Sequence, residues 1–190
     1  MDATAIIGIL SRAVPAAALE SIESGDGMPT IAVPREQLVE VGLALRDTPE
    51  LRFVFLADIV PVDYLPRTPR FEITYLLASL GTGEYGATPK RLRLRVRVPG
   101  GDDTTLPSVS SVWPAAGWAE REAYDLFGLH VSAHPDLRRI LMPDDWEGFP
   151  LRKDYPVQIK MPVKTYEPLQ VSQDQFVASI EANRDRARKD

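Results

Sequence analysis

The first third of the chain carries helical and strand patterns in short runs. Apolar positions at helical spacing predict a helix over residues 3–12, and a second short helix is expected over residues 16–24. The Gly-Asp-Gly run at 25–27 marks a turn, and the apolar run at 30–33 predicts a short strand. A proline then opens a helix pattern that ends at residues 48–49, Thr-Pro. We therefore expect helices and strands to be mixed in this part of the chain.

Three longer strand patterns follow, over residues 52–60, 70–80 and 91–98. The third pattern is the most regular, because apolar residues alternate strictly with basic ones. The basic positions are Arg91, Arg93, Arg95 and Arg97. Strict alternation predicts one buried face and one solvated or docked face, as in an antiparallel sheet. The arginine stripe is then either a solvated face, paired in part with carboxylates such as Glu72, or a docking face for an acidic partner or RNA.

The hydrophobic period becomes helical between residues 115 and 127. A run at 106–112 predicts one more strand before this helix. Small residues share one face of the helix, which lets it lie close to a sheet, and Gly128 follows where a left-handed C-cap residue belongs. Together these elements predict an α+β, two-layer domain over residues 1–128, with a mixed, largely antiparallel sheet packed by helices on one face.

The chain after Gly128 has a different character. Prolines recur at short intervals there, and no helix or long strand fits between them. Residues 129–171 therefore predict a long, extended, Pro-rich arm. Residues 172–190 are polar and charged, which predicts a tail that can form an exposed helix.

Composition excludes several classes of function. The 190 residues include 17 prolines and no cysteine, which rules out disulfides, thiolate metal ligands and a cysteine nucleophile. The net charge of −5 gives no support for nonspecific nucleic-acid binding. No apolar run is long enough to span a bilayer, and the N-terminus carries Asp2 and no early cation. We therefore expect a cytosolic chain with no direct membrane span.

The most unusual composition lies between residues 113 and 155, which contain all three tryptophans and both histidines. Long ordered loops of this kind usually carry function. One hypothesis is a metal site, because His130 and His134 are four residues apart. Gly128 and Pro135 flank the pair, however, and disfavour the helix that would put both rings on one face.

A second hypothesis is acid–base catalysis by the carboxylates of this segment together with His134. These carboxylates lie beside Arg and Lys residues, so ion pairs are the simpler interpretation, and no known catalytic motif is present. A third hypothesis is partner binding, because Trp, Tyr and Arg are enriched at interface hot spots and a proline-rich chain loses little entropy on docking. The simplest alternative is a loop that only covers its own domain.

Residues 120–156 resemble a family signature. The first part reads Glu120-Arg121-Glu122-Ala123-Tyr124-Asp125-Leu126-Phe127-Gly128, and the second begins with His134-Pro135 and continues Asp-Leu-Arg-Arg-Ile-Leu. The runs Met-Pro-Asp-Asp-Trp-Glu-Gly at 142–148 and Pro-Leu-Arg-Lys-Asp-Tyr-Pro at 150–156 complete it. The pattern is similar to that of the C subunit, the 30-kilodalton-type subunit of proton-pumping NADH:quinone oxidoreductase (respiratory complex I). Ala133 stands where Gly is usual in the family, and Phe149 where His is usual.

The resemblance implies a non-redox scaffold and assembly subunit in the peripheral arm of that complex. It implies docking principally on the D subunit, which forms the quinone site with the B subunit, and further contact with the B and I subunits. No catalytic centre and no cofactor are expected in this chain, while other subunits use FMN, iron–sulfur clusters and quinone. The implied location is the cytoplasmic side of the cell inner membrane, as a peripheral part of the complex. Nucleic acid is not an expected partner.

Under this hypothesis the Pro-rich arm contacts the partner. The expected contact residues are Arg138, Arg139, Asp144, Trp146, Arg152, Lys153, Asp154 and Tyr155. Arg suits interface ion pairs because its planar fork binds a carboxylate with two hydrogen bonds, and Trp146 is expected to fill a pocket. Two alternatives remain. One is the equivalent subunit of a membrane-bound hydrogenase-type complex, and the other is a free-standing enzyme that uses His134 and nearby carboxylates.

Overall fold

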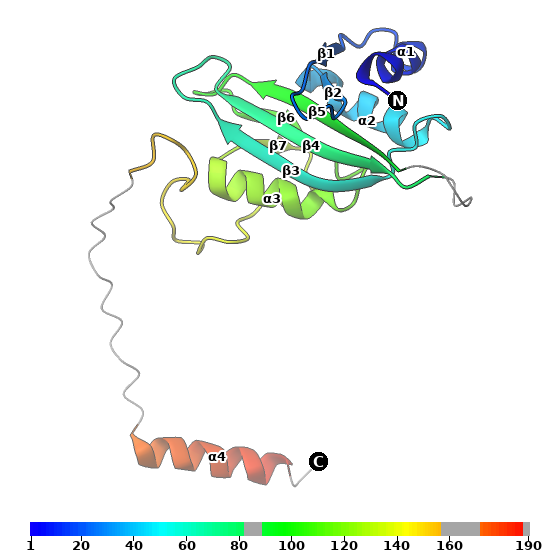
Figure 1. The fold of residues 1–190 in the computed structure, drawn as a ribbon. Helices are drawn as coiled ribbons and strands as arrows, with labels where there is room; N and C mark the ends of the chain where they lie inside the picture. The colour runs from blue at the N-terminus through cyan, green and yellow to red at the C-terminus, as the bar shows by residue number, and fades with distance from the viewer. Residues whose placement is uncertain (82–88, 157–171, 188–190) are drawn as a thin grey trace. The chain divides into compact units, whose positions relative to one another are not determined.

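The computed structural model of this chain describes residues 1–81, 89–156 and 172–187. The chain divides into two units, Met1–Pro156 and Val157–Asp190. All the strands that the structure describes lie in the first unit (Figure 1).

A five-stranded sheet forms the centre of the first unit. Its strands are β1 (Glu20–Ile22), β2 (Thr30–Ala32), β3 (Phe55–Asp63), β4 (Phe71–Ser79) and β5 (Lys90–Val98). Their order is β1-β2-β5-β4-β3, in which β2 and β5 are parallel and the other pairs are antiparallel. A separate parallel pair joins β6 (Thr105–Pro107) to β7 (His130–Ser132).

The helices of the first unit bury their apolar faces against one face of the five-stranded sheet. They are α1 (Ala3–Ala13), the 3₁₀ turn η1 (Arg35–Gln37) that leads into α2 (Leu38–Asp47), and α3 (Ala116–Phe127). Their buried side chains form one cluster with the core-facing residues of the sheet. Trp113 belongs to this cluster, and its Nε1 donates a hydrogen bond to the carbonyl of Phe53 at 2.9 Å. The predicted α+β class, with a mixed, largely antiparallel sheet and helices on one face, is confirmed.

Strands β4 and β5 follow the alternating pattern of the sequence. Their core-facing side chains are Phe71, Ile73, Tyr75 and Leu77 on β4, and Leu92, Leu94, Val96 and Val98 on β5. The opposite surface of β3, β4 and β5, which we call the open face, carries the arginine stripe. The expected partial pairing is confirmed, because Glu72 lies 3.5 Å from Arg95 and 4.0 Å from Arg97. A further ion pair joins Arg93 to Asp26.

Two short strands differ from the predicted elements. Residues 16–24, predicted as a helix, contain β1, which pairs antiparallel with β2 across the turn at 25–27. A three-residue strand has too few positions to show a period of two, so the pattern did not reveal it. The predicted strand at 106–112 is limited to β6, because the chain turns at 110–112.

Strand β3 forms one edge of the sheet and departs from regular geometry in two places. Its register with β4 shifts at Ala57, which forms a bulge. Pro61 withholds one backbone N–H from the strand. Its exposed apolar side chains are Phe55, Val60 and Val62.

The division into units differs from the predicted boundary after Gly128. Residues 129–156 belong to the first unit, together with the α+β domain. The rest of the predicted arm, residues 157–171, lies outside the described residues. In the segment predicted as a polar tail, the second unit contains α4 (Gln173–Ala187). No helix in the described ranges has the length and apolar character that a membrane crossing requires.

Candidate functional site

Helix α3 presents two buried carboxylates, Glu120 and Asp125. Gly128 ends the helix in the left-handed conformation, with φ of 68°, as the sequence predicted. The chain then forms β7 and returns over α3 as residues 133–156, which we call the signature segment. The contacts that hold this irregular segment define the candidate site.

Asp125 holds the signature segment on α3 through a set of contacts that we call the first clamp. Its Oδ2 accepts the backbone N–H groups of Ile140, Leu141 and Met142 at 2.7–2.9 Å, and Arg139 donates to Oδ1 at 2.7 Å. Burial alone would raise the pKa of Asp125, but these four donors outweigh it and lower the pKa. The carboxylate therefore stays ionised at neutral pH and fixes the turn at 139–142.

Two guanidinium groups satisfy backbone carbonyls of the same segment. Arg139 Nη2 donates to the carbonyls of Trp146 and Gly148, each at 3.0 Å. Arg121 on α3 donates to the carbonyls of Arg138 and Arg139 at 3.1 and 2.9 Å. An irregular segment lacks the repeating hydrogen bonds of a helix or sheet, so these side chains supply the donors that its backbone needs.

A second clamp ties the end of the signature segment to the sheet. Asp63, the last residue of β3, is 4% exposed and binds Arg70 at 2.7 and 3.0 Å. Arg70 also binds Asp154 with two hydrogen bonds, and Asp63 accepts the backbone N–H of Lys153 at 2.9 Å. Burial would raise the pKa of Asp63, but hydrogen bonds from Arg70, Lys153 and Leu65 outweigh it and lower the pKa to about 2.

Phe149 and Arg152 pack the segment onto the C-terminal end of α3. The Phe149 ring lies edge-on to Tyr124, with 6.2 Å between ring centroids. The guanidinium of Arg152 lies 4.6 Å from the centroid of Phe149 and donates to the carbonyls of Phe127 and Gly128. An apolar ring at position 149 therefore packs and covers a cation, which are roles that need no titratable group.

Trp146 and Tyr155 stack on each other across a turn of the signature segment. Their ring centroids are 6.5 Å apart, with 24° between the ring planes. The Tyr155 hydroxyl donates to the carbonyl of Glu147 at 3.2 Å. Trp146 Nε1 is buried and has no hydrogen-bond partner within the described part of the chain. Both rings thus contribute to the internal order of the segment.

Glu120 lies under the beginning of the signature segment. It accepts hydrogen bonds from Ser108 Oγ and from the N–H of Val109, both at 2.7 Å. Its Oε2 lies 3.8 Å from His134 Nε2. Burial raises the pKa of Glu120, and the two hydrogen bonds offset this effect only in part.

Backbone groups occupy both ring nitrogens of His134. Nε2 lies 3.0 Å from the carbonyl of Gly117, and Nδ1 accepts the N–H of Asp136 at 3.0 Å. These contacts fit the neutral ring with its proton on Nε2. No ring lone pair is left for a metal ion or a substrate, which favours a structural role over the metal and acid–base hypotheses. Across residues 1–81, 89–156 and 172–187, no three His, Asp or Glu side chains are grouped to hold a metal ion.

Comparison with known protein families identifies the family to which this chain belongs. Residues 31–160 match the model of the family described as "Respiratory-chain NADH dehydrogenase, 30 Kd subunit". The chain belongs to this family. The matched range contains the five-stranded sheet apart from β1 and Thr30, the first residue of β2. It also contains α3, both clamps and the signature segment.

Curated relatives agree with the family. The chain is 43% identical over 157 residues to the NADH-quinone oxidoreductase C subunit of Roseiflexus sp. (strain RS-1), covering 83% of this chain and 86% of the relative. It is 44% identical over 140 residues to the NADH-quinone oxidoreductase C 2 subunit of Rhizobium etli (strain CIAT 652), covering 74% and 71%. As a member of the family, the chain is a subunit of NADH:quinone oxidoreductase, respiratory complex I, an electron-transport complex that carries FMN, iron–sulfur clusters and quinone elsewhere.

A solved structure has a similar fold. It is a chain of the membrane-bound sulfane sulfur reductase, an archaeal respiratory membrane complex, with a TM-score of 0.66. The two chains are 21% identical, and the match covers 81% of this chain and 85% of that chain. This likeness concerns the fold alone.

The structure separates the predicted contact residues of this family member into two groups. Those that hold the signature segment itself are Arg139, Trp146, Arg152, Asp154 and Tyr155. Those with exposed side chains are Arg138, Asp144 and Lys153, of which Arg138 pairs with the exposed Asp136 of the same segment at 2.9 Å. Among the other signature residues, Glu120, Asp125 and His134 lie inward, Arg121 bridges to the segment, and Glu122 and Pro135 are exposed. Contact with a partner stays a prediction for all of them.

In α3 and the signature segment, three exposed apolar residues were not predicted from the sequence. Trp118, Leu141 and Leu151 are 66%, 61% and 52% exposed. The guanidinium of Arg121 lies 5.4 Å from the centroid of the Trp118 ring. Trp118 was detectable in principle, because it lies off the small-residue face of α3. The exposure of Leu141 depends on the turn that Asp125 fixes, and no periodic pattern reveals that turn.

Proposed function

We propose that this chain is a non-redox scaffold and assembly subunit in the peripheral arm of a proton-translocating NADH:quinone oxidoreductase. In this proposal it docks principally on the D subunit, which we call the quinone-site subunit, at the cytoplasmic side of the cell membrane. Further contacts are made with the B and I subunits. The chain contributes binding surface, and the electron-transfer chemistry belongs to other subunits. Family membership supports the complex, and the site supports the binding role.

The observation that carries the proposal is an exposed apolar and basic surface on a firmly held segment. Its residues are Trp118, Arg121, Arg138 and Leu141, which we call the signature surface. Trp and Arg are the residue types that dominate interface hot spots. Contiguous exposed apolar patches with a polar rim mark protein interaction sites, whereas apolar side chains exposed singly do not.

The two clamps make this surface suitable for docking. Asp125 and Asp63 hold the signature segment in one conformation through bonds to its backbone. A segment that is ordered before binding loses less conformational entropy when it docks, so more of the contact energy appears as affinity. The clamp carboxylates thus act through the conformation of the segment, because its backbone, Arg139 and Arg70 already occupy them.

The proposal is tested in membranes from cells that express the tagged full-length chain in place of the native copy. Trp118→Ala and Leu141→Ser each remove an exposed side chain and keep both clamp carboxylates, and Leu141→Ser also keeps the backbone N–H that Asp125 binds. We expect recovery of the quinone-site subunit with the tagged chain to fall about tenfold for each, as the loss of a hot-spot side chain implies. Leu43→Ser, at an exposed leucine of α2, is the matched control and should leave recovery unchanged.

Two further readouts separate the alternatives. NADH:quinone reductase activity of the membranes should fall in proportion to the assembled complex. If both anchor variants recover the quinone-site subunit as the wild type does, the signature surface is not the docking site. Recovery of hydrogenase large and small subunits in its place would favour the hydrogenase-type alternative, and a catalytic activity of the isolated chain would contradict the scaffold role.

A further inference from the structure

The open face of the five-stranded sheet changes from apolar to basic across three strands. In one row of paired residues, Val62 of β3 lies beside Glu72 of β4, which lies beside Arg97 of β5. The next row on this face repeats the order with Val60, Thr74 and Arg95. The helices of the first unit pack on the other face of the sheet. The open face is therefore a surface separate from the signature surface.

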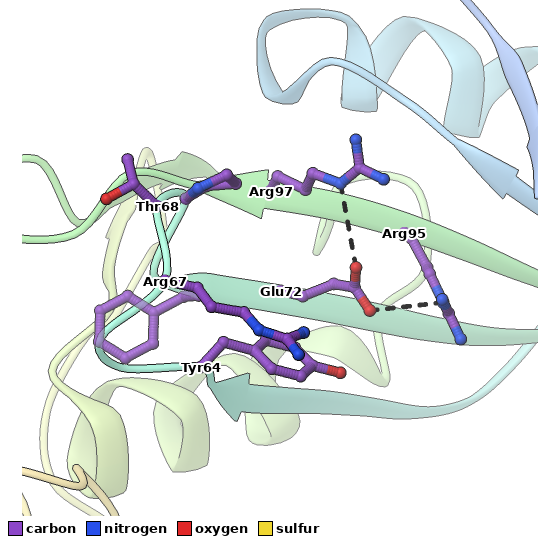
Figure 2. A pocket seen from close by; sticks show the side chains of 8 residues that line it. Tyr64, Arg67, Thr68, Glu72, Arg95 and Arg97 are labelled. Carbon is purple, nitrogen blue, oxygen red and sulfur yellow. Dashed lines mark ion pairs between the residues drawn. The ribbon is translucent and has the colours of Figure 1, made fainter.

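A hollow of about 300 Å³ lies at one end of the open face. Its lining includes Tyr64 and Arg67 from the chain between β3 and β4, Glu72 from β4, and Arg95 and Arg97 from β5. Figure 2 shows Glu72 between Arg95 and Arg97, with the Arg67 side chain beside the Tyr64 ring. The Arg67 guanidinium lies 5.4 Å from the centroid of that ring.

The charges of this hollow do not balance. Its lining contains three guanidinium groups and one carboxylate. Glu72 approaches Arg95 and Arg97 only at 3.5 and 4.0 Å, and Arg97 keeps half of its side chain exposed. Arg95 Nε is buried, and Glu72 lies 3.5 Å from it without forming a hydrogen bond. A buried donor without a hydrogen bond is unfavourable, so a second carboxylate would complete the site and bring its charge closer to neutral.

The apolar side of the open face points to a protein as the source of that carboxylate. Val60 and Val62 of β3 are 38% and 37% exposed and form an apolar strip at one end of the edge strand, while Phe55, 49% exposed, lies beyond the exposed Asp58. Neighbouring strands are about 4.8 Å apart, so this strip and the arginines of β5 are separated by about 10 Å. An α-helix with its side chains is about 10–12 Å wide. One helix lying along the strands can therefore cover the apolar strip and the arginines together.

We propose that the open face is a second docking surface, which takes an amphipathic helix from a neighbouring subunit of the complex. The apolar stripe of that helix lies over β3, and its carboxylates lie over β5, with one entering the arginine hollow. A free phosphate or a lipid headgroup matches the hollow but not the apolar strip beside it. The surface goes beyond the proposed function, which assigns docking on the quinone-site subunit to the signature surface and assigns no role to the open face.

The first experiment identifies what covers the open face in the assembled complex. The photoreactive residue p-benzoylphenylalanine replaces Val62 in the full-length chain, and the complex is irradiated in membranes. We expect cross-linking to another subunit, within a segment that has Asp or Glu one helical turn from apolar residues. The same replacement at the exposed Ser11 of α1 is the matched control and should give a different pattern. Cross-links to lipid, or to a segment without carboxylates, would overturn the proposal.

The second experiment tests the charge of the hollow. Arg97→Glu should lower the fraction of the chain found in the complex by about tenfold, because it places like charges opposite each other. Arg12→Glu, at an exposed arginine of α1, is the matched control. Replacing the cross-linked carboxylate of the partner by Lys should restore assembly of the Arg97→Glu chain. If Arg97→Glu melts below the wild type, Arg97→Gln replaces it, and a smaller loss of assembly is expected.

The two proposals fail independently of each other. Normal assembly of a folded Arg97→Glu chain would refute the second docking surface and would not affect the proposal for the signature surface. Normal assembly of the Trp118→Ala and Leu141→Ser chains would refute docking through the signature surface instead. Loss of assembly in both sets, with the leucine and arginine controls unchanged, is the result that supports two surfaces.

Discussion

The carboxylate of Asp63 accepts the backbone N–H of Lys153 at 2.9 Å, across 90 residues of sequence. Asp63 ends β3, and Lys153 lies close to the end of the signature segment. The same carboxylate holds Arg70, which also binds Asp154. One buried group therefore joins the central sheet to the segment that carries the family signature.

Asp63→Asn is expected to lower the free energy of unfolding by about 2–3 kcal/mol. The amide carries no charge, so the Arg70 guanidinium loses the buried carboxylate that pairs with it. Urea unfolding of the full-length chain measures this loss. Asp102→Asn, at an exposed carboxylate in a turn, is the control and should change the midpoint little. Equal midpoints for both variants would show that the clamp contributes nothing to stability.

The lowered pKa of Asp63 also predicts how acid affects stability. The carboxyl titrates near 3.8 in the unfolded chain and at about 2 in the folded one. Its contribution is therefore present above about pH 4 and is lost as the pH falls toward 2, and the shift corresponds to about 2 kcal/mol. Between these pH values the urea midpoint of the wild type should fall more steeply than that of Asp63→Asn. Parallel curves would contradict this assignment.

Asp125→Asn is expected to loosen the turn at 139–142, because the amide loses the ion pair with Arg139 and binds three backbone N–H groups less strongly. Hydrogen exchange at residues 140–142 should become about tenfold faster or more, which corresponds to a local loss of at least about 1.4 kcal/mol. Exchange in β4 and β5 should change less. Glu122→Gln, on the exposed side of the same helix, should leave exchange at 140–142 as in the wild type.

The contribution of Glu120 to stability depends on pH in the opposite sense to that of Asp63. Its folded pKa lies above its usual value of 4.5 because burial disfavours the charge. Its contribution to stability is therefore present below that value and is lost as the pH rises through the folded pKa. Glu120→Gln removes this titration and keeps an acceptor for the N–H of Val109. Melting curves at about pH 4 and pH 7 should show the variant gaining relative to the wild type as the pH rises.

Gly128 and Gly101 provide a matched pair of substitutions. Both have φ between 64° and 68°, so an alanine at either position is strained in the same way. A Cβ at Gly101 meets open space, whereas a Cβ at Gly128 collides with Phe149 and Arg152. Gly101→Ala should cost about 1–2 kcal/mol, and Gly128→Ala should cost clearly more and also release the signature segment. Equal losses of stability for the two variants in thermal unfolding would mean that Phe149 and Arg152 move away from the new methyl group without destabilising the chain.

Regular elements were predictable where one physical signal repeats. The strict alternation at 91–98 predicted β5, and the left-handed cap at Gly128 was predicted from a glycine at the end of a helical period. The helix predicted at 16–24 was wrong, because β1 is too short to carry a period and is formed through its pairing with β2. Tertiary pairing, and not local preference, determines such strands.

The signature segment was recognisable from residue identity, but its architecture was not. Ion pairs between the carboxylates and arginines of this region were expected, and Asp125 and Arg139 form one, but their hydrogen bonds to the surrounding backbone were not expected. Contacts between a helix side chain and a distant irregular backbone leave no periodic trace in the sequence. Exposed anchors such as Leu141 follow from those contacts, so they too required the structure.

The irregular edge strand has a consequence for the chain before it joins its complex. A straight, apolar edge invites a second copy to add its own strand, which is a common beginning of aggregation. The bulge at Ala57 and the missing N–H of Pro61 interrupt the row of donors and acceptors that such an addition needs. The chain can thus expose the apolar side chains of β3 before it assembles with other subunits, because the irregular edge disfavours self-association.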